Sequence, residues 1–162
     1  MNDPMTILKA DHREVKKALT TLADTDEGPE REQLVSEVSQ SLSLHMQIEE
    51  QLLYPLVSSE IGAEDEEEAE IEHSLARDGL AKVNELVAKP GFGAAVEMLK
   101  AGIVHHVEEE ETELLPELKS ALARDEWLAL GDKIAAAKAE AGAPVSPSRG
   151  RRSTKRPGSK KR

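Results

Sequence analysis

The chain has 162 residues, of which 38% are hydrophobic and only 2% aromatic, so it has room for one domain with an aliphatic core. Its net charge is −11 and 33% of its residues are charged, a composition typical of helices with solvated outer faces. The absence of cysteine excludes disulfides, thiolate metal sites and cysteine nucleophiles. No apolar run is long enough for a membrane span or a secretory signal, so we expect a cytoplasmic protein without membrane contact.

Five helical segments are predicted, covering about residues 4–24, 30–57, 64–89, 92–123 and 125–141. The first begins after Asp3, a capping residue, with Pro4 at the first helical position. Pro55 is expected to kink the second segment, and Pro116 to interrupt the fourth. Because short connections make neighbouring helices antiparallel, we predict an all-α fold over residues 1–141: an up-down-up-down four-helix bundle with a short fifth helix.

Residues 142–162 contain proline, serine, glycine and basic residues with nothing to bury, so we predict a disordered basic tail. From Arg149 onward the chain carries eight basic residues and no acidic one, which leaves a net charge of −19 on residues 1–148. An acidic body does not attract nucleic acid, and a tail without aromatic residues offers anionic surfaces only weak attraction. We therefore expect no specific nucleic-acid partner, and nothing in the sequence indicates an oligomeric state.

The most informative feature is an internal repeat at an offset of 61 residues. His12 maps onto His73, and His45 maps onto His106. The same offset relates four further pairs, which are Glu49 and Glu110, Glu50 and Glu111, Leu53 and Leu114, and Pro55 and Pro116. Six such matches favour two helical hairpins related by a pseudo-twofold axis.

Six of the repeated residues lie where helical periodicity demands a core residue, namely His12, His45, Glu49, His73, His106 and Glu110. At 1.5 Å rise per residue, all six lie within about one helical turn of the same height in the bundle. An ionised glutamate on an apolar stripe costs several kcal/mol unless a cation or donors compensate it. Four histidines facing two such glutamates therefore predict a metal centre.

The spacing of these residues indicates two metal ions. Residues four apart on a helix lie on nearly the same face, so His45 and Glu49 can reach one ion, as can His106 and Glu110. Imidazole and carboxylate ligands suit iron, manganese or zinc. If both carboxylates bridge the ions, each ion has two histidines and a share of both bridges, which leaves positions open for an exogenous ligand. We expect such a centre to be reactive.

The chain resembles the hemerythrin-like (HHE cation-binding) domain family over about residues 3–141, and most closely its small mycobacterial members. The resemblance rests on His12, His45-xxx-Glu49-Glu50-xx-Leu53-Tyr54-Pro55, Glu72-His73 and His105-His106-xxx-Glu110-Glu111-xx-Leu114-Leu115-Pro116. It implies a centre of two non-haem iron ions, joined by an oxo or hydroxo bridge, with the six residues above as ligands. Oxygen-carrying members have a fifth histidine one turn after the third-helix histidine, where this chain has Arg77.

The function that the resemblance implies is catalase-like decomposition of hydrogen peroxide in oxidative-stress defence, with peroxide or O2 as the small-molecule ligand. One peroxide would be oxidised to dioxygen and the next reduced to water. The alternative is a module that binds or senses oxygen, nitric oxide or iron without turnover. A third interpretation, a helical interaction protein without metal, requires the six inward polar residues to be tolerated on their own.

Tyr54 is a further candidate residue, the only tyrosine of the chain. It corresponds to Leu115 in the repeat, and ideal helix geometry places it about 180° from His45, which favours a packing role. It also precedes Pro55, and residues before proline tend to leave the helical conformation. Tyr54 could therefore also turn toward the position that the fifth histidine leaves vacant. There it would serve as an extra metal ligand or lie beside the ligands.

Arg77 is the second additional candidate, about 40° from His73 on an ideal helix. Two roles are open for it. It either steers an anionic peroxide species beside the metal ligands or, more simply, pairs with a nearby carboxylate such as Glu110 or Glu111. In both cases the missing histidine leaves a vacant position at the second ion.

Overall fold

The computed structural model describes residues 1–144. Helices are the only regular secondary structure within that range. The elements are α1 (Pro4–Ala23), α2 (Pro29–Ile48), η1 (Glu49–Leu53), α3 (Tyr54–Glu60), α4 (Ala63–Glu85), α5 (Phe92–Glu109), η2 (Glu110–Leu114), α6 (Leu115–Ala121) and α7 (Arg124–Glu140). The predicted all-α fold is confirmed. Residues 145–162, most of the predicted tail, lie outside the described residues, so the disorder of that tail stays a prediction.

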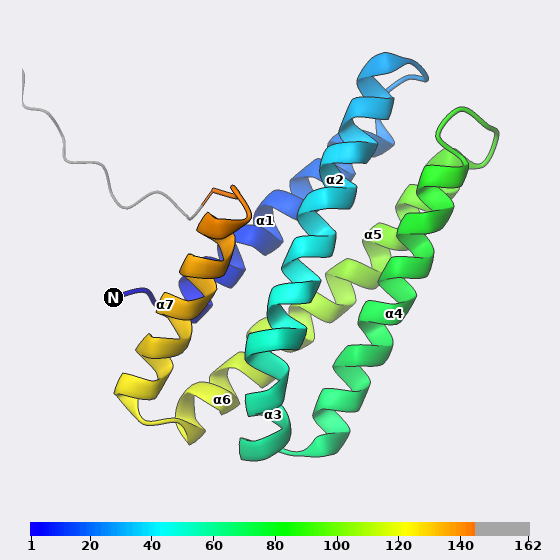
Figure 1. Cartoon of the computed structure of the whole chain (residues 1–162). Coiled ribbons are helices and arrows are strands. Elements are labelled where there is room, and N and C mark those ends of the chain that lie inside the picture. Colours follow the sequence, from blue (N-terminus) through cyan, green and yellow to red (C-terminus); the bar gives the residue numbers. More distant parts are fainter. Residues whose placement is uncertain (145–162) are drawn as a thin grey trace, which may run out of the picture.

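Helices α1, α2, α4 and α5 form the four-helix bundle (Figure 1). α1 packs against α2 and α5, and α4 packs against the same two helices, so each member of the bundle has two antiparallel neighbours. The α1–α2 and α4–α5 connections lie at one end of the bundle and the α3–α4 and α6–α7 connections at the other (Figure 1). The two repeated hairpins therefore face each other along their length.

Local sequence signals fix where the helices begin. Asp3 caps α1 by accepting a hydrogen bond from the Thr6 amide at 3.1 Å, and Pro4 occupies the first helical position, as predicted. Gly91 precedes α5 with φ +93°, a left-handed conformation that glycine adopts without a steric penalty.

The two predicted irregularities at proline are single π-helical turns. The Tyr54 amide donates to the Glu49 carbonyl, five residues back, and the Leu115 amide donates to Glu110 in the same way. The following residues, Pro55 and Pro116, have no amide hydrogen, and in a regular helix the ring would clash with the carbonyl four residues earlier. A wider turn avoids that clash, and it occurs at the same place in both hairpins.

A layer of buried polar side chains separates two apolar clusters. One cluster lies toward the α1–α2 connection and includes Leu19, Leu42 and Val96. The other lies toward α3, α6 and α7 and is built around residues such as Leu115 and Trp127. The polar layer is thus held between two well-packed cores, which exclude bulk water from it.

Helix α7 packs against α1 and α2 and covers one side of the bundle (Figure 1). Its contact with the N-terminal segment requires Gly131, because a Cβ at that residue would lie 1.8 Å from the Asn2 carbonyl oxygen. The Trp127 indole donates to the Asp3 carboxylate at 3.3 Å and ties the same segments together. None of the described helices is long and apolar enough to cross a membrane.

Candidate metal centre

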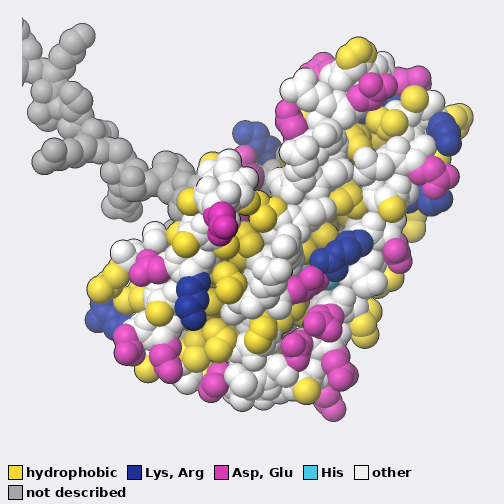
Figure 2. Space-filling view, in the orientation of Figure 1, with side chains coloured by type: hydrophobic (Ala, Val, Ile, Leu, Met, Phe, Trp, Pro, Cys, Tyr) yellow, Lys and Arg dark blue, Asp and Glu magenta, His cyan; other side chains and the backbone are white. Residues whose placement is uncertain are grey.

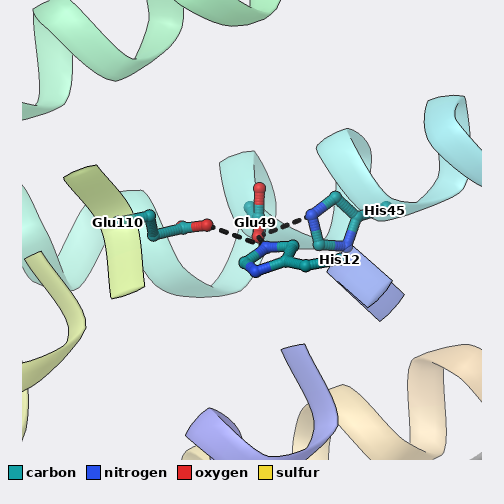
Figure 3. A group of neighbouring side chains, drawn as sticks. All are labelled: His12, His45, Glu49 and Glu110. Atoms are coloured by element: carbon teal, nitrogen blue, oxygen red, sulfur yellow. Dashed lines mark ion pairs between the residues drawn. The ribbon is translucent and has the colours of Figure 1, made fainter. Parts of the chain in front are cut away.

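The structure brings all six predicted ligand residues together in the middle of the bundle. Each comes from a different element: His12 from α1, His45 from α2, Glu49 from η1, His73 from α4, His106 from α5 and Glu110 from η2. Each is at most 7% exposed. Figure 3 shows the side chains of His12, His45 and Glu110 converging on Glu49 from different helices. Among the described residues, Lys138 is the only other buried polar or charged side chain.

The inward-facing atoms form two groups that share one carboxylate; the groups are His12, His45, Glu49 and Glu110, and Glu49, His73 and His106. Glu49 Oε1 lies 2.9 Å from His45 Nε2 and 3.7 Å from His12 Nε2. Its second oxygen, Oε2, lies 3.2 Å from His73 Nε2 and 4.0 Å from His106 Nε2. One oxygen therefore faces each group, which is the arrangement of a bridging ligand.

Glu110 faces both groups through a single oxygen. Its Oε2 atom lies 3.1 Å from His12 Nε2 and 3.9 Å from His106 Nε2. The first group thus has four potential ligands, whereas the second has three and a weaker approach from Glu110.

The atoms that face the centre are not satisfied by one another. His12 Nε2 and both carboxylate oxygens of Glu49 and Glu110 are buried and make no hydrogen bond of good geometry. Buried carboxylates without partners are strongly destabilising. Cations between these groups would supply the missing interactions, and imidazole with carboxylate is a donor set for iron, manganese or zinc. The residues present therefore fit a pair of metal ions.

Without metal, the neighbouring carboxylates raise the pKa values of His12, His45 and His106. Burial alone would lower the pKa of His12, but the carboxylates of Glu110 and Glu49 raise it to about 10. The same opposition raises the pKa of His106 to about 10 and that of His45 to about 9. Burial would raise the pKa of Glu49, yet the surrounding histidines, His45 foremost, hold it well below its ordinary value. Metal binding must therefore displace protons from these histidines.

The outward nitrogen of each histidine meets a second carboxylate. His12 Nδ1 lies 2.8 Å from Glu111, and His73 Nδ1 lies 2.9 Å from Glu50. Since a carboxylate only accepts, each Nδ1 carries the proton and Nε2 is turned to the centre. Such partners fix the orientation of metal-binding histidines.

The remaining two histidines also face carboxylates. His106 Nδ1 lies 2.5 Å from Glu72, whereas His45 Nδ1 lies 3.6 Å from Asp11 and makes no hydrogen bond. Asp11 and Glu72 are themselves 61 residues apart, as are Glu50 and Glu111, so the repeat includes the outer carboxylates as well as the ligands.

Arg77 pairs with Glu50, not with the predicted Glu110 or Glu111. Its guanidinium donates to Glu50 at 2.8 Å and lowers the pKa of that carboxyl against the effect of burial. The predicted pairing with a nearby carboxylate is thus present, but the two named partners were wrong, because the Glu110 carboxylate is turned inward and Glu111 is engaged by His12. Arg77 therefore supports His73 from outside, through Glu50.

Tyr54 lies beside the second group, not on the packing face that an ideal helix would give it. It is fully buried, and its hydroxyl lies 2.9 Å from His73 Nε2. The π turn inserts one residue between His45 and Tyr54, which changes their angular offset from about 180° to about 80°. Burial, reinforced by the charges of Glu49 and Glu110, raises the pKa of the Tyr54 phenol well above its ordinary value.

Sequence reasoning missed two supporting residues, Lys138 and Asp11. Lys138 is 4% exposed, lies four residues after the buried Ile134 on α7 and pairs with Asp11, the outer partner of His45. Lys138 could have been found because it is a lysine on the apolar stripe of its helix. Asp11 could have been found because it lies 61 residues before Glu72, the offset of the repeat.

A helical bundle that buries four imidazoles and two carboxylates around one point defines a bundle-type metal-binding protein. Consistent with this class, residues 3–118 match the hemerythrin HHE cation binding domain. The chain belongs to this family.

Two known proteins are similar to the chain. One is a solved structure from Mycobacterium kansasii, a hemerythrin HHE cation binding domain-containing protein described as an Rv2633c homolog. It is 25% identical, with a TM-score of 0.77 and coverage of 86% of this chain and 87% of that one. The other is a protein from Nostoc named DNA nickase, 24% identical over 135 residues. That match covers 83% of this chain but only 38% of the Nostoc protein, so most of the relative has no counterpart here.

Proposed function

We propose that the centre holds two iron ions joined by an oxo or hydroxo bridge and decomposes hydrogen peroxide, as part of oxidative-stress defence. The support is the pair of histidine groups that share Glu49, the second of which has fewer ligands than the first. When bound, an iron pair supplies two-electron chemistry, by which one peroxide is oxidised to dioxygen and a second is reduced to two waters. The chain supplies the ligands and a site protected from bulk water.

The observation that carries the proposal is the size and lining of the space beside the ligands. A cavity of about 10 Å³ is lined by the four inward histidines and by Val15, Leu42, Met46, Ile103 and Val107. This is about the space that one water molecule requires. Its small size excludes ligands of more than a few atoms, and the apolar wall leaves the ligand-bearing side as the place for a polar reactant such as peroxide.

Tyr54 is proposed to act at the open side of the second group. Its hydroxyl lies 2.9 Å from His73 Nε2, and it is the phenol nearest the three-residue group. In the metal-free protein the raised pKa keeps the phenol protonated, and its hydroxyl is hydrogen-bonded to His73 Nε2. Next to a bound cation the same oxygen is placed to serve as an additional ligand or to give a proton to the reactant.

The proposal is tested by oxygen evolution from hydrogen peroxide by the iron-loaded protein, measured together with iron content. We expect turnover with two iron ions per chain, and loss of both iron and turnover in Glu110→Ala. Glu97→Ala, which removes an exposed carboxylate from α5, is the matched control and should leave both unchanged. Protein that holds two iron ions but evolves no oxygen would contradict the enzymatic proposal.

A reversible spectral change with oxygen or nitric oxide, without turnover, would instead support the binding or sensing module. No DNA-directed role is included in the proposal, although one relative is named a DNA nickase. Residues 1–148 carry a net charge of −19, which opposes the approach of a phosphate backbone.

A further inference from the structure

An acidic cleft leads from the surface toward the second histidine group. Its volume is about 80 Å³, room for a few water molecules. One wall is formed by Asp65, Glu68 and Glu72 of α4, and the other by Glu109, Glu113 and Glu117. No lysine or arginine is among the described residues that line it. Figure 2 shows acidic side chains gathered over the first half of α4.

The inner end of the cleft is made by two ligands of the centre, His106 and Glu110. Glu110 is 1% exposed, and neither of its carboxylate oxygens has a hydrogen-bond partner. The cleft therefore ends on a buried carboxylate that makes no hydrogen bond and has His12 as its nearest charge partner, which an acidic surface patch alone would not provide. A bound cation would supply the interactions that these oxygens lack.

Three side chains at the side of the cleft form a second potential ligand set. They are Glu72, His105 and Glu109, whose donor atoms lie within 4.8 Å of one another. His105 Nε2 lies 3.5 Å from Glu72 Oε1 and 3.3 Å from Glu109 Oε1. Two donors that each bind one ion at about 2.1 Å with a tetrahedral angle are about 3.4 Å apart, so these separations suit a shared cation.

Glu72 connects the two sites, since its Oε2 accepts from His106 Nδ1 while its Oε1 faces His105.

The other outer carboxylates are neutralised by permanent cations. Arg77 pairs with Glu50, and the buried Lys138 pairs with Asp11. A divalent cation that approached along those sides would be repelled. Glu72 faces no such cation but His105, whose side chain is 64% exposed. Imidazole is a common metal ligand, so this side offers a donor where the other sides offer a positive charge.

We propose that Glu72, His105 and Glu109 bind a divalent transition-metal cation, such as Fe²⁺ or Mn²⁺, and that this cation passes along the acidic cleft to the buried centre. The inference rests on the centre being a metal site, as in the proposed function, but not on peroxide chemistry. It assigns to Glu72 of α4 and to His105 and Glu109 of α5, which lie outside the buried centre, the capture of the metal that the buried residues hold.

The outer site is tested at equilibrium by paramagnetic broadening. The chain has five histidines, and four lie in the centre, so the imidazole signal of His105 is separable from the rest. Full-length protein is first loaded with zinc and then titrated with Mn²⁺. We expect the His105 signal to broaden at substoichiometric Mn²⁺, and Glu109→Gln to prevent this. Glu108→Gln, an exposed neighbour outside the ligand set, should not.

The route is tested by the rate at which metal-free protein takes up Fe²⁺. We expect His105→Ala and Glu109→Gln to slow uptake about tenfold without changing the final iron content, since electrostatic capture acts on the rate. Glu108→Gln, with the same charge change as Glu109→Gln, should load at the wild-type rate.

Unchanged uptake rates in both variants, or equal broadening in Glu109→Gln and the wild type, would overturn the inference. Failure of the proposed function gives different results. If the wild-type protein takes up no iron, the uptake amplitude is absent. If it takes up iron without turnover, the rates still report on the cleft.

Discussion

The two repeated hairpins, residues 4–60 and 63–121, are alike in what holds the centre and different in what surrounds it. Both supply two histidines, one inward glutamate, two outer carboxylates and a π turn. They differ at Tyr54, whose counterpart is Leu115, and at the outer carboxylates Asp11 and Glu72. Asp11 pairs with the buried Lys138, whereas Glu72 faces the exposed His105.

The residues that the hairpins share have a role in metal binding, and the residues that differ have a role in the reactivity that we propose. The shared residues are those that would hold the two proposed ions, because a symmetric set of ligands and outer carboxylates is present on both sides. The residues that differ make the two groups inequivalent. The first group is closed by α7 and Lys138, while the second has the Tyr54 hydroxyl on one side and the acidic cleft on another.

The largest expected effect comes from removing the carboxylate that both groups share. Glu49→Gln replaces one of the two bridging oxygens by an amide nitrogen, and it removes the negative charge that faces His45 and His73. We expect iron content to fall from two per chain to below one, as measured by metal analysis after gel filtration. Glu32→Gln, an exposed change on the preceding helix α2, is the control; equal iron content in the two variants would contradict a bridging role.

Lys138→Met tests the closed side of the comparison. The substitution leaves Asp11 largely buried without its cation, and breaking a buried pair costs about 3 kcal/mol of the free energy of unfolding. His105→Ala is the corresponding change on the open side. Because His105 is exposed, we expect it to cost less than about 0.5 kcal/mol. Urea unfolding of both variants checks the difference, and equal losses would mean that the two sides are equivalent.

Tyr54→Phe tests whether the second group is the reactive one. Loss of the hydrogen bond to His73 should cost about 1 kcal/mol of stability. We expect iron content to stay at two per chain while peroxide turnover falls. A visible phenolate-to-iron absorption band in the wild type that is absent from Tyr54→Phe would identify the tyrosine as a ligand. Wild-type turnover in Tyr54→Phe would assign it to packing alone.

The metal-free protein should show a smaller, pH-dependent effect. The pKa values of His12 and His106, about 10, and of His45, about 9, lie above the unfolded value of 6.5. Their stabilisation is therefore fully present below pH 6.5 and lost as the pH rises toward 10. We expect the melting temperature of metal-free protein to fall over that range. The gain in melting temperature on metal loading should rise over the same range, because protons no longer compete.

Much of the architecture could be predicted, because it depends on periodicity and on the repeat. The helices, the six inward residues and their common height follow from spacings of three and four and from the offset between His12 and His73. The π turns could not, since a proline at 55 predicts a break in regular helix without specifying how the break is accommodated. That one inserted residue is what turns Tyr54 toward His73.

Ion pairs between side chains of different helices could also not be predicted from the sequence. Arg77 reaches Glu50 because α4 packs against α2 and α3, and Lys138 reaches Asp11 because α7 folds back onto α1. Such pairs depend on how helices are placed relative to one another, which no single-helix pattern specifies.

The central claim is that the six buried residues hold a pair of iron ions in one shared site. An anomalous difference map from a crystal of the iron-loaded protein, measured at the iron edge, tests it most directly. We predict two peaks per chain, one beside His12 and His45 and one beside His73 and His106, with Glu49 between them. A single peak, or iron bound away from these residues, would contradict the account.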